Sequence, residues 1–122
     1  MTLTFTLALS VAVAGGLGAT LRYLATLVLP LPWGVLAVNT VGSAVAGVAL
    51  ALADAAAISG DIRLVLVTGF AGGLTTFSTF SVETIELARD GRWRTATLNV
   101  VASLAAGIGL ALGGYALTAA LI

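Results

Sequence analysis

The sequence predicts an all-α integral membrane protein with four transmembrane helices, the third of them broken. The first observation is composition: hydrophobic residues make up 60% of the 122 residues and charged residues only 8%. Soluble domains carry about 25% charged residues, and small ones have too little interior to bury so much apolar surface. The second observation is that four uncharged stretches each approach the roughly 20 apolar residues that cross a bilayer.

The first helix is expected over residues 4–28. No charged side chain precedes Arg22, and the chain then reaches Pro30-Leu31-Pro32-Trp33, where two prolines in three residues exclude an unbroken helix. A cleaved signal peptide is the alternative, because Ala12-Val13-Ala14 resembles a cleavage site. Signal peptides begin with positive residues, however, and none precedes this apolar stretch.

The other helices are expected over residues 33–53, 62–88 and 95–120, joined by short polar connections at 54–61 and 89–94. The whole chain is therefore expected to be a single four-helix transmembrane domain, whose function lies inside the membrane. The connections between the first and second helices and between the third and fourth share one side of the membrane. That side has Arg22, Arg89, Arg92 and Arg94, whereas the other has only Arg63. The positive-inside rule then places both termini outside.

Several classes of function are excluded by composition. The chain has no Cys and no His, which removes thiol chemistry and the commonest general base and metal ligand. Five Arg balance five acidic residues, whereas nucleic-acid binding needs a basic surface. We expect neither an enzyme nor a nucleic-acid partner.

Small residues four positions apart recur in all four helices. Such pairs let helix backbones approach closely in lipid, and they predict tight packing that includes an interface between subunits. The pairs are Gly15 and Ala19, Ser43 and Gly47, Gly69 and Gly73, and Gly109 and Gly113.

The third helix contains an unusual segment at residues 69–81, where Gly, Thr, Ser and Phe crowd together. Each glycine of the Gly72-Gly73 pair weakens a helix by roughly 1 kcal/mol relative to Ala, so we predict a break near Gly73–Thr75. A break at mid-membrane depth frees backbone groups, which occurs where the backbone lines a cavity or binds an ion. The alternative is an unbroken helix whose hydroxyls bond their own carbonyls.

The side chains after the break favour an anion. Phe77 and Phe80 are three residues apart and share a helix face, with the hydroxyls of Ser78 and Thr79 beside them. Aromatic ring edges are positive, so an anion could pass along them while hydroxyls donate hydrogen bonds. Simple packing of the two rings is the alternative.

Four more polar side chains lie within the predicted spans. Asn39 is expected either to face a polar path or to bond another helix, because an unpartnered amide in hydrocarbon is costly. Arg22 reaches either the headgroups or an aqueous vestibule. Glu83 either lines a vestibule or pairs with an Arg. Asn99 lies nearer a helix end, which suits an interfacial residue.

Three segments together resemble the Fluc/CrcB fluoride-channel family, and the resemblance covers the whole chain. They are Gly15-Gly16-Leu17-Gly18-Ala19-Thr20-Leu21-Arg22-Tyr23, Val38-Asn39-Thr40-Val41-Gly42-Ser43, and Gly69-Phe70-Ala71-Gly72-Gly73-Leu74-Thr75-Thr76-Phe77-Ser78-Thr79-Phe80. The third segment is the most specific. The resemblance implies passive, selective fluoride export across the bacterial inner membrane by an antiparallel dual-topology homodimer with two pores.

The resemblance also implies roles for individual residues. The fluoride pore would be lined by Asn39, Phe77, Ser78, Thr79 and Phe80. Arg22 and Glu83 would lie at its vestibule. A structural sodium ion at the dimer centre would be held by the backbone carbonyls of Gly72 and Thr75. Because the Arg bias between the two sides is strong, a homologous second subunit of fixed opposite orientation is the alternative partner.

Two other functions compete with a passive fluoride channel. A proton-coupled exporter, such as a small multidrug transporter, needs an acidic residue in the middle of its first helix, and residues 4–21 contain none. A structural subunit of a larger membrane complex would explain the small residues but not a hydroxyl-rich break beside Asn39.

Overall fold

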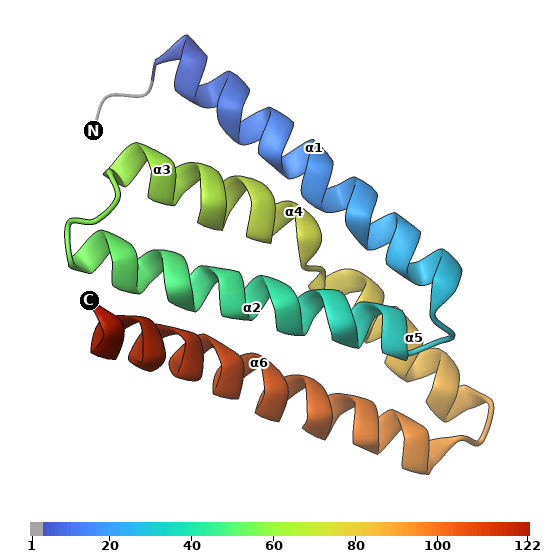
Figure 1. Ribbon diagram of the computed structural model, residues 1–122. Coiled ribbons are helices and arrows are strands. Elements are labelled where there is room, and N and C mark those ends of the chain that lie inside the picture. The colour runs from blue at the N-terminus through green and yellow to red at the C-terminus, as the bar shows by residue number, and fades with distance from the viewer. Residues whose placement is uncertain (1–3) are drawn as a thin grey trace.

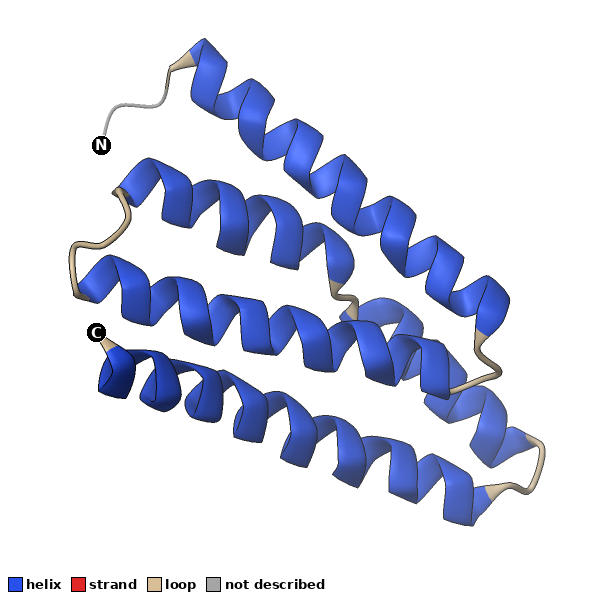
Figure 2. Cartoon of the chain, viewed as in Figure 1, coloured by secondary structure: helices blue, strands red, loops and turns tan. Residues whose placement is uncertain are grey.

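The computed structural model describes residues 4–122, whose secondary structure elements are all helices joined by short loops, with no strand in that range (Figure 2). Three spans are continuous helices: α1 (Phe5–Val28), α2 (Trp33–Asp54) and α6 (Trp93–Leu121). The remaining span consists of α3 (Gly60–Leu64), the π-helical η1 (Val65–Ala71), α4 (Gly72–Leu74) and α5 (Phe77–Arg89). All four spans are long and apolar enough to cross a membrane, which confirms the predicted all-α class with four spans.

Local sequence explains where the helices begin. Thr4 caps α1 by accepting the Leu7 amide, and Ser59 caps α3 by accepting the Ile62 amide, both at 3.2 Å. The Ser59 cap starts the third span at Gly60, two residues before the predicted start. Gly91, with φ of +75°, forms the turn between α5 and α6, a conformation that glycine adopts without strain.

The helix α2 occupies the centre of the bundle. It packs against α6 on one side and against α1 and η1 on the other, as the ribbon shows (Figure 1). Both described ends of the chain lie at the same end of the bundle, as four spans require. Many of the buried residues lie on α2, and they include Gly34, Val35, Val38, Gly42, Gly47, Ala49 and Ala51.

Close contacts between helix backbones depend on glycine. A Cβ at Gly73 would collide with the Gly15 carbonyl oxygen, so α4 and α1 touch backbone to backbone. A Cβ at Gly47 would likewise collide with the Ala111 carbonyl on α6. One pair makes no such contact within the chain: Gly109 and Gly113 have no atom within 4 Å of an added Cβ.

The neighbouring glycines of α6 take that role instead. A Cβ added at Gly114 would lie 3.1 Å from the Ala44 carbonyl oxygen. A Cβ added at Gly107 would lie 3.5 Å from Ser43 Oγ. Spacing alone could not assign the correct pair, because α6 is apolar on every side. The identity of the facing helix decides which of its glycines are covered.

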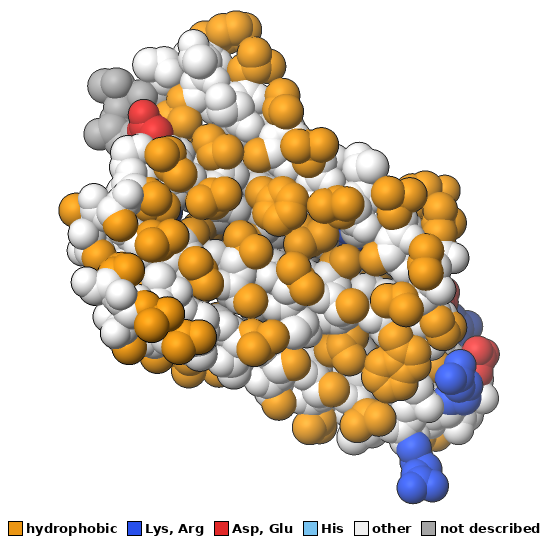
Figure 3. All heavy atoms as spheres, viewed as in Figure 1, with side chains coloured by type: hydrophobic (Ala, Val, Ile, Leu, Met, Phe, Trp, Pro, Cys, Tyr) orange, Lys and Arg blue, Asp and Glu red, His pale blue; other side chains and the backbone are white. Residues whose placement is uncertain are grey.

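The surface is that of a membrane protein. A broad apolar band covers the face in Figure 3, and charged side chains gather mainly at its two ends. Exposed large hydrophobic residues occur along every span. Such a surface suits a lipid environment.

Candidate functional site

The third span is interrupted at Thr75 and Thr76, whose backbones are extended with φ/ψ of −87°/156° and −152°/125°. We predicted the break near Gly73–Thr75, but α4 stays helical through Gly73. The glycine serves the close contact with Gly15 on α1. Its helix-weakening tendency therefore does not place the break, and the interruption extends one residue beyond the predicted range.

The half-span before the break contains a π-helical segment that the sequence did not predict. At the end of η1 the amide of the next residue, Gly72, donates to the carbonyl of Val67, five residues back. Segments of this kind are frequent at functional sites. The apolar sequence Val65–Ala71 carries no signal for it, because α- and π-helical turns bury the same kinds of side chain.

Asn39 holds the break in place from α2. Its Oδ1 accepts the Thr76 amide at 2.7 Å, and its Nδ2 donates to the Thr76 carbonyl at 3.0 Å. The Asn39 oxygen thus replaces the Gly72 carbonyl, which would accept the Thr76 amide in a continuous helix, and the Asn39 nitrogen adds a bond to the Thr76 carbonyl. Of the two expectations for Asn39, bonding to another helix is the one the geometry shows. One N–H of the amide group is left for a further acceptor, since the group has two.

Arg22 also reaches the break. Its Nη1 donates to the Thr75 carbonyl at 2.9 Å, and the side chain is half-buried. It therefore points into the protein, in contrast to an arginine that extends to the headgroups. The Thr75 carbonyl oxygen keeps a second lone pair, since backbone oxygens accept two hydrogen bonds.

Carbonyls at the break lose the amides that a continuous helix would supply, and those of Gly72 and Thr75 are among them. In an α-helix the Gly72 carbonyl accepts from residue 76 and the Thr75 carbonyl accepts from residue 79. Here the Thr76 amide donates to Asn39, and the Thr79 amide donates to Thr76 Oγ1 at 3.2 Å. Carbonyl oxygens suit hard cations. Residues 4–122 contain no cluster of three side-chain metal ligands, so a cation here would need these backbone oxygens.

On α2, Gly42 leaves space for the broken segment of the third span. The sequence analysis missed this role. A Cβ at this position would collide with Thr75 Cγ2. Gly42 lies three residues after Asn39, on the same face of α2. That spacing could have predicted this role. An amide on a helix face can bond an irregular segment, and a glycine on the same face leaves space for it.

The hydroxyls meet at the N-terminus of α5. Thr76 Oγ1 donates to Thr79 Oγ1 at 3.0 Å and lies 3.3 Å from Ser78 Oγ. The rings of Phe77 and Phe80 are neighbours, with centroids 5.9 Å apart and planes tilted by 41°. Phe77 is 80% exposed in the single chain. The structure therefore brings together the rings and the hydroxyls that the sequence singled out.

Glu83 lies a turn further along α5. Its Oε2 is buried and has no hydrogen-bond partner among the described residues. Arg22 uses Nη1 for the Thr75 carbonyl, so that nitrogen does not pair with Glu83. The carboxylate is thus placed in the protein without a hydrogen bond at one of its oxygens.

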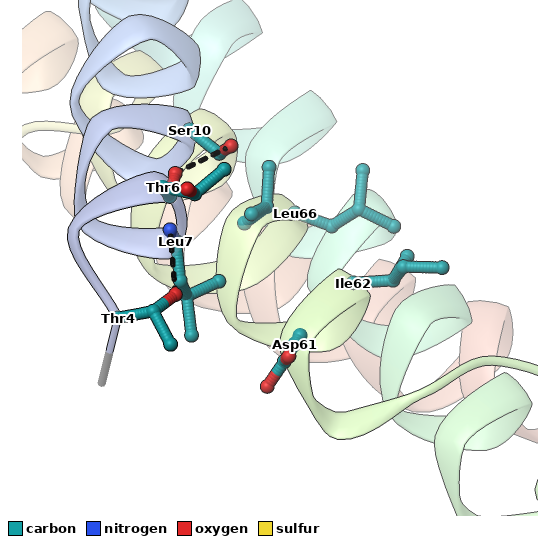
Figure 4. Close-up of a pocket in the computed structure, with 8 residues that line it drawn as sticks. Thr4, Thr6, Leu7, Ser10, Asp61, Ile62 and Leu66 are labelled. Atoms are coloured by element: carbon teal, nitrogen blue, oxygen red, sulfur yellow. Dashed lines mark hydrogen bonds between the residues drawn. The ribbon is translucent and has the colours of Figure 1, made fainter. Parts of the chain in front are cut away.

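The groove in Figure 4 lies elsewhere, between the start of α1 and α3. It has a volume of about 380 Å³ and is lined by residues that include Thr4, Ser10 and Asp61. The Thr4 hydroxyl caps α1, and the Ser10 hydroxyl donates to the Thr6 carbonyl of its own helix. These hydroxyls stabilise α1 itself, and the groove is separate from the break.

Comparisons with known proteins show what the chain resembles. The sequence profile of the family described as "CrcB-like protein, Camphor Resistance (CrcB)" matches residues 9–115. "Fluoride-specific ion channel FluC" of Geobacter sulfurreducens is 44% identical over 104 residues, which cover 80% of this chain and 84% of the relative. The protein of the same name from Shewanella baltica is 43% identical over 102 residues, with 79% and 82% covered. "Fluoride-specific ion channel FluC 1" of Streptomyces avermitilis is 41% identical over 109 residues, with 84% and 88% covered.

Proposed function

Because this chain belongs to the CrcB family, we propose that it is a fluoride-selective passive ion channel that exports fluoride from the cytoplasm. It would act as a multi-pass protein of the bacterial inner membrane. The observation that carries the proposal is the start of a helix, α5, in the middle of a membrane span, with hydroxyls, an amide and two aromatic rings around it.

This arrangement suits a small, strongly hydrated anion. The N-terminus of a helix carries a partial positive charge and free N–H groups. Ser78, Thr79 and the second N–H of Asn39 add neutral donors, and the ring edges of Phe77 and Phe80 add weakly positive surface. None of these groups carries a full charge, so the anion can leave again, as conduction requires.

We assign Arg22 and Glu83 to the vestibule of this pathway. The Arg22 guanidinium bonds the Thr75 carbonyl and would raise the local potential for an entering anion. Glu83 lies on α5 one turn beyond Phe80 and has an unpartnered buried oxygen, which an aqueous vestibule would hydrate.

A second copy of the chain, running antiparallel, would complete the channel and give two pores. The break leaves Gly72, Phe77 and Ser78 exposed on the single chain, and polar backbone at membrane depth has to be covered by protein or water. A homologous subunit of fixed opposite orientation would cover the same face and is the alternative partner.

A sodium ion at the centre of that dimer would be a structural cofactor, held by the carbonyls of Gly72 and Thr75 from both copies. Two features support this site. Both carbonyls have lost their helical amide partners. Gly72 lies in α4, the last helical turn before the break, and Thr75 is its C-cap, where the helix dipole favours a cation.

The test is fluoride efflux from liposomes that contain the purified chain alone. We expect rapid efflux, measured with a fluoride electrode, once an ionophore balances the charge, and no efflux of chloride. Phe80→Ile should lower fluoride efflux while the dimer stays intact by light scattering, because an aliphatic side chain has no positive edge. Absence of fluoride efflux from well-folded protein would contradict a channel built from one subunit type. Adding a homologous subunit of fixed opposite orientation would then test whether the channel is built from two different subunits.

A further inference from the structure

Asn99 is a polar side chain that the proposed pore leaves unused. It lies on α6, is 1% exposed and is the one buried polar residue in the described part of the chain. The sequence suggested an interfacial residue near a helix end, and the structure shows that its side chain is enclosed by the protein. A buried amide is unfavourable unless it is hydrogen-bonded, so its partners indicate what it does.

Those partners connect α6 to the backbone of α5. Asn99 Nδ2 donates to Thr84 Oγ1 at 2.9 Å, and Thr84 Oγ1 donates to the Phe80 carbonyl at 2.7 Å. Ser103 Oγ makes a weaker contact with Asn99 Oδ1 at 3.5 Å. The amide on α6 thus reaches, through a single hydroxyl, the backbone of a residue whose ring belongs to the proposed pore.

The break makes α5 dependent on such contacts. An unbroken helix would fix the rotation of its second half through the continuous ladder of backbone hydrogen bonds, but the extended residues 75–76 interrupt that ladder. Beyond the break, α5 leaves α1 and packs mainly against α6, with a small contact to α2 (Figure 1). Asn39 holds its first residues through Thr76, and the Asn99 contact lies about two turns further on.

We propose that Asn99 is a positioning residue for conduction: acting through Thr84, it sets the rotation of α5 about its axis and hence the direction in which Phe80 presents its ring. Apolar side chains between the two helices resist small rotations weakly, whereas hydrogen bonds depend on direction. This inference rests on the proposed fluoride-channel function, and fluoride efflux through the unmodified chain tests that function separately.

The decisive variants remove the hydrogen bonds with little change of shape. Thr84→Val removes the hydroxyl, Thr84→Ser restores it, and Asn99→Leu removes the amide. Thr20→Val is the matched control, because Thr20 Oγ1 also donates to a carbonyl of its own helix, that of Gly16 at 2.8 Å, and it is exposed on α1. We expect Thr84→Val and Asn99→Leu each to lower the fluoride efflux rate roughly tenfold, a coupling of ordinary size for one network.

A second measurement reports ring placement directly. The chain has four Phe, so 4-fluorophenylalanine gives four ¹⁹F resonances, each assigned by its loss on substitution. We expect Thr84→Val to shift the Phe80 resonance and to leave that of Phe5, at the start of α1, unchanged. Combining Asn99→Leu with Thr84→Val should lower efflux no further than either change alone.

The outcomes are distinct. Lowered efflux with a shifted Phe80 resonance, both restored in Thr84→Ser and absent in Thr20→Val, supports the proposal. Normal efflux in Thr84→Val overturns it, and so does lowered efflux with an unmoved Phe80 resonance, since the defect would then arise elsewhere. Because Thr84→Val nearly preserves side-chain shape, the test stands even if Asn99→Leu fails to fold. Absent efflux in the unmodified chain would count against the channel, while the resonance shifts would still report on α5.

Discussion

Asn39 shows how one side chain can stabilise a backbone break inside a membrane. Its amide group donates to the Thr76 carbonyl and accepts the Thr76 amide, and the second of these bonds replaces the one that the Gly72 carbonyl would accept in a continuous helix. In hydrocarbon no water replaces these partners, and each unpaired backbone group costs several kcal/mol. At the residue scale, the proposed pore therefore depends on Asn39 in two ways. The side chain holds the broken backbone at Thr76 in place, and its remaining N–H can donate to the anion.

We expect Asn39→Asp to suppress fluoride efflux at neutral pH by at least about tenfold. A carboxylate keeps the acceptor for the Thr76 amide but loses the donor for its carbonyl, which destabilises the fold by roughly 1–3 kcal/mol. Its charge also repels the anion. Efflux from liposomes and the thermal unfolding midpoint in detergent measure the two effects. Ser10→Ala is the control, because the Ser10 hydroxyl bonds only its own helix in the structure; unchanged efflux in Asn39→Asp would remove this residue from the pathway.

At the scale of elements, α2 decides where the third span breaks. It is the central helix, and one of its faces presents Asn39 and, one turn later, Gly42 to the extended residues. The amide attracts the backbone at Thr76, and the glycine leaves space for the Thr75 side chain. Packing between two helices therefore fixes a feature that the glycines of the broken span do not fix themselves.

Gly42→Ala is expected to displace the break. The added Cβ would collide with Thr75 Cγ2, and overpacking of this kind costs roughly 1–3 kcal/mol. Thr75→Ser removes that methyl group, so the double variant Gly42→Ala with Thr75→Ser should recover both thermal stability and fluoride efflux. Gly109→Ala, where an added Cβ meets nothing within 4 Å, is the matched control. Failure of the double variant to recover would show that space for the methyl group is not what Gly42 provides.

At the scale of the whole molecule, the exposed break is the surface that the proposed second copy would cover. Phe77 is 80% exposed, and the carbonyls of Gly72 and Thr75 lack helical amide partners. A second copy related by a two-fold axis would duplicate both carbonyls around one point, because isologous interfaces repeat the same patch. The proposed sodium site therefore requires the dimer, and the dimer would gain stability from the ion.

Replacing sodium by a large organic cation should lower the thermal midpoint of the dimer in detergent. We expect a dependence on sodium concentration, because an ion that binds only the assembled state stabilises it by mass action. Potassium at equal ionic strength is the control for screening. A midpoint independent of the cation would contradict an exchangeable sodium at the break.

The extent of the helices could be predicted because apolar length is set locally. Four uncharged stretches are enough to define four spans, and the structure places them within a few residues of the expected bounds. The grouping of Phe77 and Phe80 followed from their spacing on one helix face. The pairing of glycines was less certain, since Gly109 and Gly113 show the same spacing as Gly69 and Gly73 but meet no neighbouring helix.

By itself, the sequence determined that this is a four-span membrane protein with an irregular third span rich in hydroxyls and aromatic rings. Only the tertiary structure decided that the interruption falls at Thr75 and Thr76, that Asn39 and Arg22 bond it, and that Asn99 is buried against α5. The physical reason is the distance along the chain over which each interaction acts. Apolar length and helical spacing act between near neighbours in the chain, whereas a backbone group freed in hydrocarbon is satisfied by whichever distant side chain the packing of helices brings to it.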